Sequence, residues 1–433
     1  MRIEAIGLKD FPPFADAVIE FPKNSDSPQI GEVQLLTGQN GTGKTRVLSL
    51  LAAALGNRAA LEARIAKSRS VVVAMDANEK PVWWRHDLGV AQGLTRDVPL
   101  DIESIISACE NAKSVVKLHQ DFIIPSKQAS VMAAAFAFRG AARVSDAKIA
   151  ALDAVKLGLQ ADHLTFEAAK NEDQILCQCM ANLTMTAAMD YRKNEPPTAS
   201  RAIRLAARIE STVSSITGRS FAFHVTYQPD VSLRVYWGGV AMKLGQLPDG
   251  LRSIIGWLVS CVAKLDALFP EHPDPLSLPL ILLLDEPESH LHPAWQRQII
   301  PAAQTLFPQA QIFVATHSPF VISSVNDGWI HILRANAEGL VTADPPRPCS
   351  KGDSWLDAVE DVLGLKERYD PETETLLAQF RTQRDEVRTG GGDYDQLLAL
   401  AKSIALRSDA LNDIMGREMW QLDRQLGRGV SAP

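Results

Sequence analysis

Hydrophobic residues cluster and alternate at the start of the chain and then repeat at helical spacing. Residues 1–21 predict two short strands joined at a Pro-Pro turn, because the apolar runs there are separated by turn-forming residues. A short buried strand is predicted at 33–37. A helix is predicted from about Lys44, since apolar residues recur there every three or four positions, and Gly56 ends it. This order of elements is typical of an α/β protein.

The rest of the chain predicts a helical insert and then a return to strands. Residues 61–218 have a mainly helical, alanine-rich pattern, interrupted by strand-like runs at 70–75 and 131–138 and by a polar break at 194–200. The later predicted elements are, in order, paired strands at 221–235, a long amphipathic helix from Leu251, strands at 280–284 and 311–315, and several helices from Trp355 with a loop at 389–393. One helix between two apolar strands favours a βαβ unit.

Composition narrows the class of protein. The chain has 433 residues, of which 22% are charged and 46% hydrophobic, and a formal net charge of −7. This balance is typical of a globular protein and excludes wholesale disorder and the fibrous classes. The acidic excess argues against a dedicated nucleic-acid-binding protein, although it is compatible with a local basic groove.

Cysteine usage and the absence of long apolar runs in the sequence indicate the cellular compartment in which the protein is expected. Five cysteines scattered along the chain are typical of reduced thiols rather than of a disulfide framework. The start MRIEAIGLKDF has no signal-peptide pattern, and no apolar run approaches the ~18 residues of a membrane span. We therefore expect a cytoplasmic protein without a membrane partner.

The strongest chemical signal is the segment GQNGTGKT, a complete G-x4-G-K-[ST] phosphate loop. Its glycines, Gly38, Gly41 and Gly43, allow backbone N–H groups to close round phosphate oxygens at a helix N-terminus. Lys44 is expected to reach the β- and γ-phosphates, and the Thr45 hydroxyl to bind Mg²⁺. The expected cofactors are therefore ATP and Mg²⁺. An ordinary glycine-rich turn is the alternative, and the strand before and the helix after argue against it.

Two further strands are expected to deliver reactive groups to the same sheet edge. The apolar run LILLL ends in Asp285, placed to hold Mg²⁺ with Thr45, and Glu286, placed to polarise the attacking water. The run IFVA is followed by THSP, in which His317 can hydrogen-bond the γ-phosphate and Ser318 can cap the next helix. A solvated strand end or a satisfied histidine would give either motif alone. Together with the phosphate loop they indicate a catalytic site.

These motifs, with Asn40 inside the phosphate loop, resemble the ATPase heads of the ABC superfamily. Within it they resemble the SMC and RecF branch and the ATPase half of the overcoming-lysogenisation-defect (OLD) proteins. The resemblance covers roughly residues 1–60 and 220–335. It implies an α/β P-loop NTPase fold with a mixed central sheet, an enlarged helical lobe and a helical C-terminal tail. It also implies an ATP-sandwich dimer, in which a signature motif from one subunit completes the phosphate loop of the other.

The resemblance places the signature motif in QLPDGLRS, directly before the amphipathic helix. Pro248 stands where the family usually has a serine that meets the γ-phosphate. Asp249 and Gly250 would then act through backbone N–H groups and the helix dipole. A plain turn before a helix is the alternative for this segment.

Two other family features are less clear in the sequence. The segment SHLHP follows Glu288, where these ATPases carry the loop that crosses the dimer interface. Its histidines, His290 and His292, could instead be half of a zinc site, but no nearby cysteine or histidine completes one. Gln128 is the only nearby candidate for the glutamine that bridges Mg²⁺ and the lobe, and it precedes the expected strand instead of following it.

Spacing distinguishes the branches of the superfamily. Along the chain, the number of residues from Lys44 to Asp285 is about twice what the resemblance requires of a compact transporter ATPase. This spacing disfavours the ATPase subunit of a membrane transporter. The insert has no sustained heptad run, which excludes an SMC-type coiled coil. The tail lacks the acidic strand ends of an OLD-type nuclease half, and Glu338-Gly339 has the pattern of a hairpin turn. We expect three regions: a discontinuous ATPase core at 1–60 and 220–345, a helical insert at 61–219, and a helical region at 346–433.

The main functional hypothesis is a stand-alone AAA-type ATPase that dimerises on ATP and controls a separate effector protein. ATPases paired with nucleases in bacterial anti-phage defence are the nearest resemblance, so a nuclease is the expected effector. The alternative is a RecF-like DNA-binding repair ATPase, which predicts DNA binding that weakens steeply with salt. Its basic candidates are Arg139, Arg143, Arg201, Arg204 and Arg208, and a solvated face is the alternative for Arg139 and Arg143.

Overall fold

The computed structural model divides into two compact units, Met1–Leu363 and Gly364–Pro433, and each is described by itself. It describes residues 1–23, 30–57, 68–75, 81–85, 89–92, 103–104, 114–116, 134–140, 144–150, 164, 166, 172–192, 200–228, 230–325, 327–349, 354–365 and 367–427. The predicted candidates Gln128 and Arg143, and most of the predicted polar break at 194–200, lie outside these residues.

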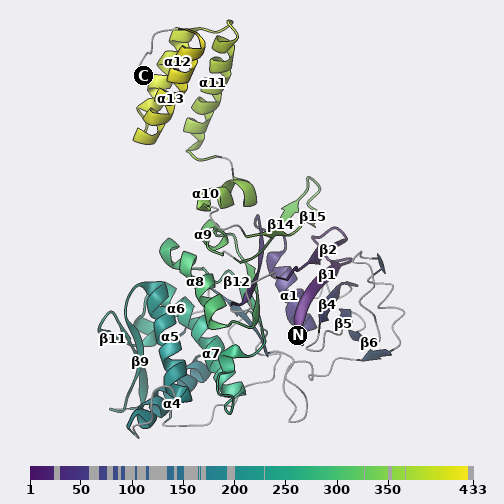
Figure 1. The fold of residues 1–433 in the computed structure, drawn as a ribbon, viewed down its shortest axis with the longest axis vertical. Coiled ribbons are helices and arrows are strands. Elements are labelled where there is room, and N and C mark those ends of the chain that lie inside the picture. The colour runs from purple at the N-terminus through teal and green to yellow at the C-terminus, as the bar shows by residue number, and fades with distance from the viewer. Residues whose placement is uncertain are drawn as a thin grey trace. The chain divides into compact units, whose positions relative to one another are not determined.

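A central sheet organises the first unit (Figure 1). Its strands, in spatial order, are β15 (Val341–Ala343), β14 (Gly328–Ala335), β3 (Glu32–Gly38), β13 (Ala310–Ala315), β12 (Leu280–Asp285) and β8 (Ala134–Arg139), and β16 (Arg347–Pro348) also pairs with β14. Every neighbouring pair from β14 to β8 is parallel, whereas β15 and β16 are antiparallel to β14. The sheet is therefore mixed, as predicted, and the hairpin turn predicted at 338–339 joins β14 to β15.

The apolar run of β12 is buried on both faces of this sheet. Leu282 and Leu284 pack into a core shared with the helical lobe, whereas Ile281 and Leu283 pack into a core with the first helix. That helix, α1 (Lys44–Ala54), lies on one face together with β1, and the next helix after β12, α8 (Pro293–Leu306), belongs to the other. Continuous burial explains why these strands read as unbroken hydrophobic runs rather than as alternating ones.

A second, antiparallel sheet packs beside α1. Its strands are, in spatial order, β2 (Ala17–Glu20), β1 (Arg2–Leu8), β4 (Val71–Met75), β5 (Pro81–Arg85), β6 (Gly89–Gln92) and β7 (Ser114–Val116). The predicted opening pair and the predicted strand at 70–75 are confirmed. The mainly helical interpretation of 61–218 is wrong for β5 to β7, because such short strands carry too few residues for an alternation to stand out.

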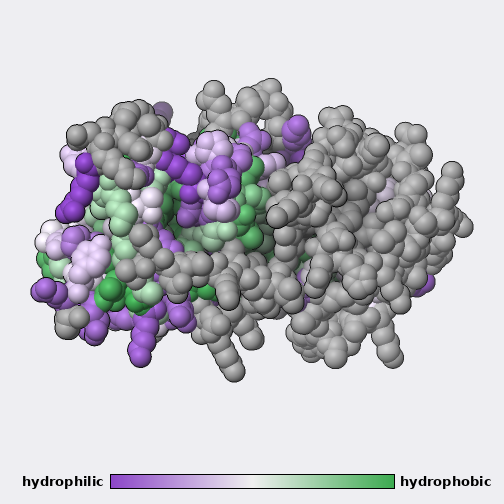
Figure 2. All heavy atoms as spheres, turned by 90° about the horizontal axis from the view of Figure 1, so that it is seen from below, coloured by the Kyte–Doolittle hydropathy of each residue, from purple (hydrophilic) through white to green (hydrophobic). Residues whose placement is uncertain are grey.

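The helical lobe lies on the α8 side of the central sheet. It contains α4 (Glu172–Arg192), α5 (Arg201–Thr217), the antiparallel strands β9 (Phe221–Thr226), β10 (Ser232–Trp237) and β11 (Val240–Met242), the turn η3 (Leu244–Gln246), and α6 (Asp249–Ile254), which continues through a π-helical turn at Ile255–Val259 into α7 (Ser260–Leu268). The predicted strand pair and long amphipathic helix are confirmed. On the face in Figure 2, described hydrophilic and hydrophobic residues lie side by side. Tyr236 and Val240 are among the exposed large side chains of the lobe.

Strand β8 comes from the segment that the sequence assigns to the insert, yet it lies beside β12 in the central sheet. Strand β4 from the same segment pairs with β1. Both sheets therefore take strands from 61–219. The division into three regions at the stated boundaries remains a prediction.

The second unit is a three-helix arrangement with its own hydrophobic core. Its helices are α11 (Pro371–Arg388), α12 (Tyr394–Ala405) and α13 (Asp409–Gln425). Asp370, Asp393 and Ser408 cap their N-termini through side-chain oxygens. The predicted loop at 389–393 separates α11 from α12. Among the helices of the described residues, none combines the length and apolar character that a membrane span needs.

Candidate active site

The phosphate loop joins β3 to α1. Its glycines Gly38, Gly41 and Gly43 have φ angles of 144°, 85° and 89°, which only glycine adopts without strain. Lys44 is buried, and its Nζ donates to the carbonyl oxygens of Gly38 and Gln39 at 2.8 and 3.0 Å. These two contacts hold the Lys44 ammonium within the phosphate loop. The backbone has the shape that the sequence motif predicts.

Burial lowers the pKa of Lys44, because the charged ammonium loses solvation. The carboxylates of Glu286, Asp285 and Glu288 act in the opposite direction. Three acidic groups at and just after the end of β12 therefore act electrostatically on the lysine of the phosphate loop.

Asp285 lies at the end of β12, where the parallel register brings it to the same sheet edge as the loop. The Thr45 hydroxyl donates to Asp285 Oδ1 at 2.9 Å, although 240 positions separate the two residues. Arg139, opposite Asp285 in the β8 pairing, donates to Oδ2 at 3.1 and 3.2 Å. Hydroxyl and carboxylate oxygens are ligands that Mg²⁺ prefers, so Thr45 and Asp285 fit that ion.

Glu286 and His317 come together at this edge from neighbouring strands. His317 Nδ1 lies 3.3 Å from Glu286 Oε1, and both side chains are partly open to solvent. The Glu286 backbone has a φ angle of 51°, and its N–H donates to the carbonyl of Ala315 at 2.8 Å. A left-handed backbone at a non-glycine residue is uncommon, and it turns this carboxylate out of the strand direction.

Glu288 is a site residue that the sequence patterns do not single out. It is 4% exposed and accepts a hydrogen bond from the Thr316 hydroxyl, which in turn accepts from the Ser318 N–H at 3.0 Å. The other carboxylate oxygen, Oε2, is buried without a hydrogen-bond partner. Burial raises the pKa of Glu288 to about 7, and the Thr316 hydrogen bond opposes the shift. Glu288 thus anchors the residues on both sides of His317. The signal from which this residue could have been predicted is its place as the second glutamate of the DEPE segment.

Glu288 gives the fold a pH dependence of known sign. Its folded pKa of about 7 exceeds the ordinary value of 4.5, so the folded chain binds the extra proton between these values. Stability therefore falls as pH rises from about 4.5 to about 7. At 1.36 kcal/mol per unit, we expect Glu288→Gln to remove about 2–3 kcal/mol of the difference in unfolding free energy between pH 5 and pH 8. Urea denaturation of both proteins at the two pH values measures it. An unchanged pH dependence in the variant contradicts the assignment.

The predicted signature segment packs against the predicted interface loop of the same chain. A Cβ at Gly250 would lie 2.9 Å from the His290 carbonyl oxygen and 3.2 Å from the Trp295 ring, so glycine allows this close approach. His292 caps α8, since its Nδ1 accepts from the Ala294 N–H at 3.2 Å. That contact gives this histidine a structural role, and the described residues contain no group of three or more potential metal ligands.

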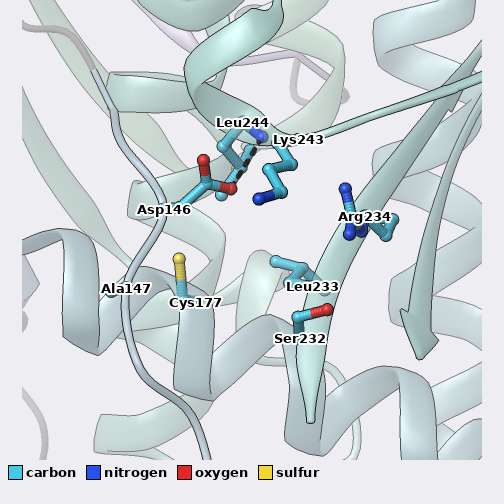
Figure 3. Close-up of a pocket in the computed structure, with 8 residues that line it drawn as sticks. All are labelled: Asp146, Ala147, Cys177, Ser232, Leu233, Arg234, Lys243 and Leu244. Carbon is cyan, nitrogen blue, oxygen red and sulfur yellow. Dashed lines mark hydrogen bonds between the residues drawn. The ribbon is translucent and has the colours of Figure 1, made fainter. Parts of the chain in front are cut away.

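A cavity of about 100 Å³ lies in the lobe, beside the turn that precedes α6 (Figure 3). Asp146 lines it and accepts hydrogen bonds from the backbone N–H groups of Leu244 and Gly245 at 3.1 and 3.4 Å. In Figure 3, Lys243 lies between Asp146 and Arg234. The cavity contains none of the predicted site residues, and Asp146 fixes the turn that leads into the signature segment.

The basic residues predicted for DNA binding on α5 are engaged within the chain. Arg201 bonds the carbonyls of Phe269 and His272 and pairs with Asp266. Arg204 bonds the carbonyl of Pro273. Arg208 pairs with Asp274 and also bonds the carbonyl of Leu306. These contacts fasten the loop after α7 to α5, which supports a structural role for the three arginines more than a phosphate-binding patch.

Comparison with known proteins gives one family match. Residues 139–323 match the family model described as "AAA domain, putative AbiEii toxin, Type IV TA system". The match begins at Arg139 and includes Asp285, Glu286 and His317. This part of the chain is therefore similar to an AAA-type ATPase domain.

Named proteins that are similar to part of this chain come from bacteria. The chain is 25% identical over 174 residues to the retron Vc95 probable ATPase of Vibrio cholerae serotype O1 biovar El Tor, covering 37% of this chain and 34% of the relative. It is 35% identical over 140 residues to the retron Ec83 probable ATPase of Escherichia coli, covering 32% and 25%. It is 29% identical over 109 residues to the Septu protein PtuA of Bacillus thuringiensis, covering 24% and 28%. The chain thus matches about a third or less of the length of these relatives.

Among solved structures, the SMC head domain from Thermotoga maritima is similar to 80% of this chain over 99% of its own length. The TM-score is 0.39 and the sequence identity 15%.

Proposed function

We propose that this ATPase head binds ATP with Mg²⁺ and hydrolyses it at the edge formed by β3, β12 and β13. The observation that carries the proposal is the contact between Thr45 and Asp285, 2.9 Å long, which joins the phosphate loop to the end of the buried strand β12. The carboxylates of Glu286, Asp285 and Glu288 act electrostatically on Lys44, which keeps its ammonium charged against the effect of burial. This combination has the groups that phosphoryl transfer requires, namely a phosphate cradle, a lysine and oxygen ligands for a cation.

In this mechanism the residues of the chain divide the work. Backbone N–H groups of the loop and Lys44 hold the phosphates, and Thr45 and Asp285 would hold Mg²⁺. When bound, the ion supplies positive charge that neutralises the phosphate oxygens. Glu286 orients the attacking water and accepts its proton as general base. His317, which contacts Glu286, holds that carboxylate in place and can hydrogen-bond the terminal phosphate.

The proposed biological role is control of a separate effector in anti-phage defence. Two relatives are named as retron ATPases and one as a Septu protein, which supports this assignment for the ATPase region. We propose that ATP draws two heads together, with Asp249 and Gly250 of one facing the phosphate loop of the other, and that a nuclease is the controlled partner. Packing of Gly250 against the loop at His290 supports a common face for both motifs.

The ATP site is tested by Lys44→Ala in the full chain. Hydrogen bonds to charged groups contribute about 1.5–3 kcal/mol, so we expect ATP affinity to fall roughly tenfold to a hundredfold, with loss of turnover. Isothermal titration with AMP-PNP and a phosphate-release assay measure the two effects. Lys402→Ala, an exposed lysine on α12, is the matched control and should behave like the wild type. Equal affinity of the Lys44 variant and the control contradicts the site.

A further inference from the structure

Arg139 ends β8, and its side chain reaches the carboxylate at the end of the neighbouring strand. Its Nε and Nη2 atoms lie 3.2 and 3.1 Å from Asp285 Oδ2, while Thr45 bonds Oδ1. The parallel register places the two residues directly opposite each other. Both oxygens of the Asp285 carboxylate are therefore engaged, one of them by a full positive charge.

The two partners differ in burial. The Asp285 side chain is 6% exposed, whereas the Arg139 side chain is 44% exposed. A buried carboxylate needs a compensating partner, and the guanidinium supplies one. Because Arg139 is half open to solvent, it can leave the carboxylate without disturbing the hydrophobic core. A divalent cation held by Thr45 and Asp285 would lie close to the guanidinium, and two positive charges at one carboxylate repel each other.

We propose that Arg139 is a resident counter-ion of Asp285 that a divalent cation has to displace, so that Mg²⁺ and the guanidinium occupy this carboxylate in turn. The inference rests on the proposed function, because it takes Asp285 as a ligand of Mg²⁺. Arg139 is then a positioning residue: it holds Asp285 in place against Thr45 until the cation arrives, and its release accompanies cation binding.

The neighbouring residue links this exchange to the lobe. The Gly140 N–H donates to the Asp285 carbonyl at 3.0 Å, and the Gly140 carbonyl accepts from the Ser253 hydroxyl. Ser253 belongs to α6, the helix that also carries Gly250. A displacement of Arg139 therefore occurs one residue from a contact with the signature helix.

In the test, Mn²⁺ is titrated into the full chain, once with AMP-PNP and once without nucleotide. Electron paramagnetic resonance measures Mn²⁺ binding. Arg139→Gln keeps hydrogen-bonding groups and removes the charge, so the cation no longer competes with a guanidinium for Asp285. We expect Mn²⁺ to bind about tenfold more tightly, which is a modest part of the interaction energy between two close charges. Arg139→Lys keeps the charge and should bind Mn²⁺ like the wild type. Arg234→Gln, which removes an arginine from β10 in the lobe, is the matched control and should show no change.

Two results overturn the proposal. One is unchanged or weaker Mn²⁺ binding by Arg139→Gln. The other is Mn²⁺ binding that survives Asp285→Asn, because the ion then lies elsewhere. Failure of the proposed function gives a different result: the wild-type chain would not bind AMP-PNP at all. In that case the nucleotide-free titration still decides whether Arg139 competes with the cation.

Discussion

Glu286→Gln is expected to lower the rate of ATP hydrolysis by about 10²–10⁴-fold while ATP stays bound. The substitution keeps the size and a hydrogen-bonding oxygen of the side chain, but the amide cannot accept the proton of the attacking water. Glu286 is partly exposed and lies 3.3 Å from His317, so the change should leave the fold intact. A phosphate-release assay measures turnover, and retained [α-³²P]ATP on the isolated protein measures binding.

The same variant tests the proposed ATP dimer. If ATP holds two heads together, the variant incubated with ATP and Mg²⁺ should double in mass by light scattering, whereas the wild type should return to its starting mass as ATP is consumed. Glu271→Gln, at an exposed carboxylate after α7, is the control and should hydrolyse ATP normally. Undiminished turnover in Glu286→Gln contradicts the catalytic assignment. Slow turnover without a change of mass contradicts the dimer alone.

Gly140→Ala is expected to disturb the same carboxylate through the backbone. A Cβ at this position would lie 1.9 Å from the Glu286 carbonyl oxygen, far inside contact distance. The Glu286–Pro287 backbone must therefore move, and overpacking of this kind costs typically about 1–3 kcal/mol of stability. We expect a lower melting temperature and a fall in kcat that exceeds any change in ATP affinity, because Glu286 moves while the phosphate loop does not.

Gly391→Ala is the matched control for that prediction. Nothing lies within 4 Å of a Cβ at Gly391, and this glycine belongs to the second unit. Calorimetry and steady-state kinetics on both variants separate a local clash from a general effect of replacing glycine. Wild-type kinetics and stability in Gly140→Ala would show that the backbone between β8 and Glu286 accommodates the methyl group.

Local sequence patterns predicted the parts of the fold that depend on neighbouring residues. The phosphate loop is contained in eight consecutive residues, and the strands that end at Asp285 and Ala315 are uninterrupted apolar runs. Parallel pairing then requires their carboxyl ends to share an edge. For this reason the sequence placed Thr45 beside Asp285 and brought Glu286 and His317 to the same edge. In the structure Thr45 contacts Asp285, and Glu286 lies close to His317. Their chemical roles remain proposals.

Other features depend on register and burial, which local patterns do not contain. The Arg139–Asp285 pair requires β8 to align with β12 across 146 positions of chain, so the sequence presented Arg139 only as a DNA-binding candidate or as part of a solvated face. Glu288 belongs to a segment with the polar composition of a solvent-exposed turn. Its burial beside Thr316 comes only from the fold. Strands β5 to β7 are held by pairing along a sheet rather than by their own alternation.

The position of β8 sets a limit on engineering a smaller protein. Joining residue 60 directly to residue 220 would keep the phosphate loop, Asp285 and His317, which are the proposed site residues of a minimal head. It would also remove the strand that pairs with β12, exposing a row of N–H and C=O groups along the most hydrophobic strand of the sheet. Such an open edge invites pairing between chains and aggregation. A trimmed version therefore has to retain Ala134–Arg139 as the protective border of the sheet.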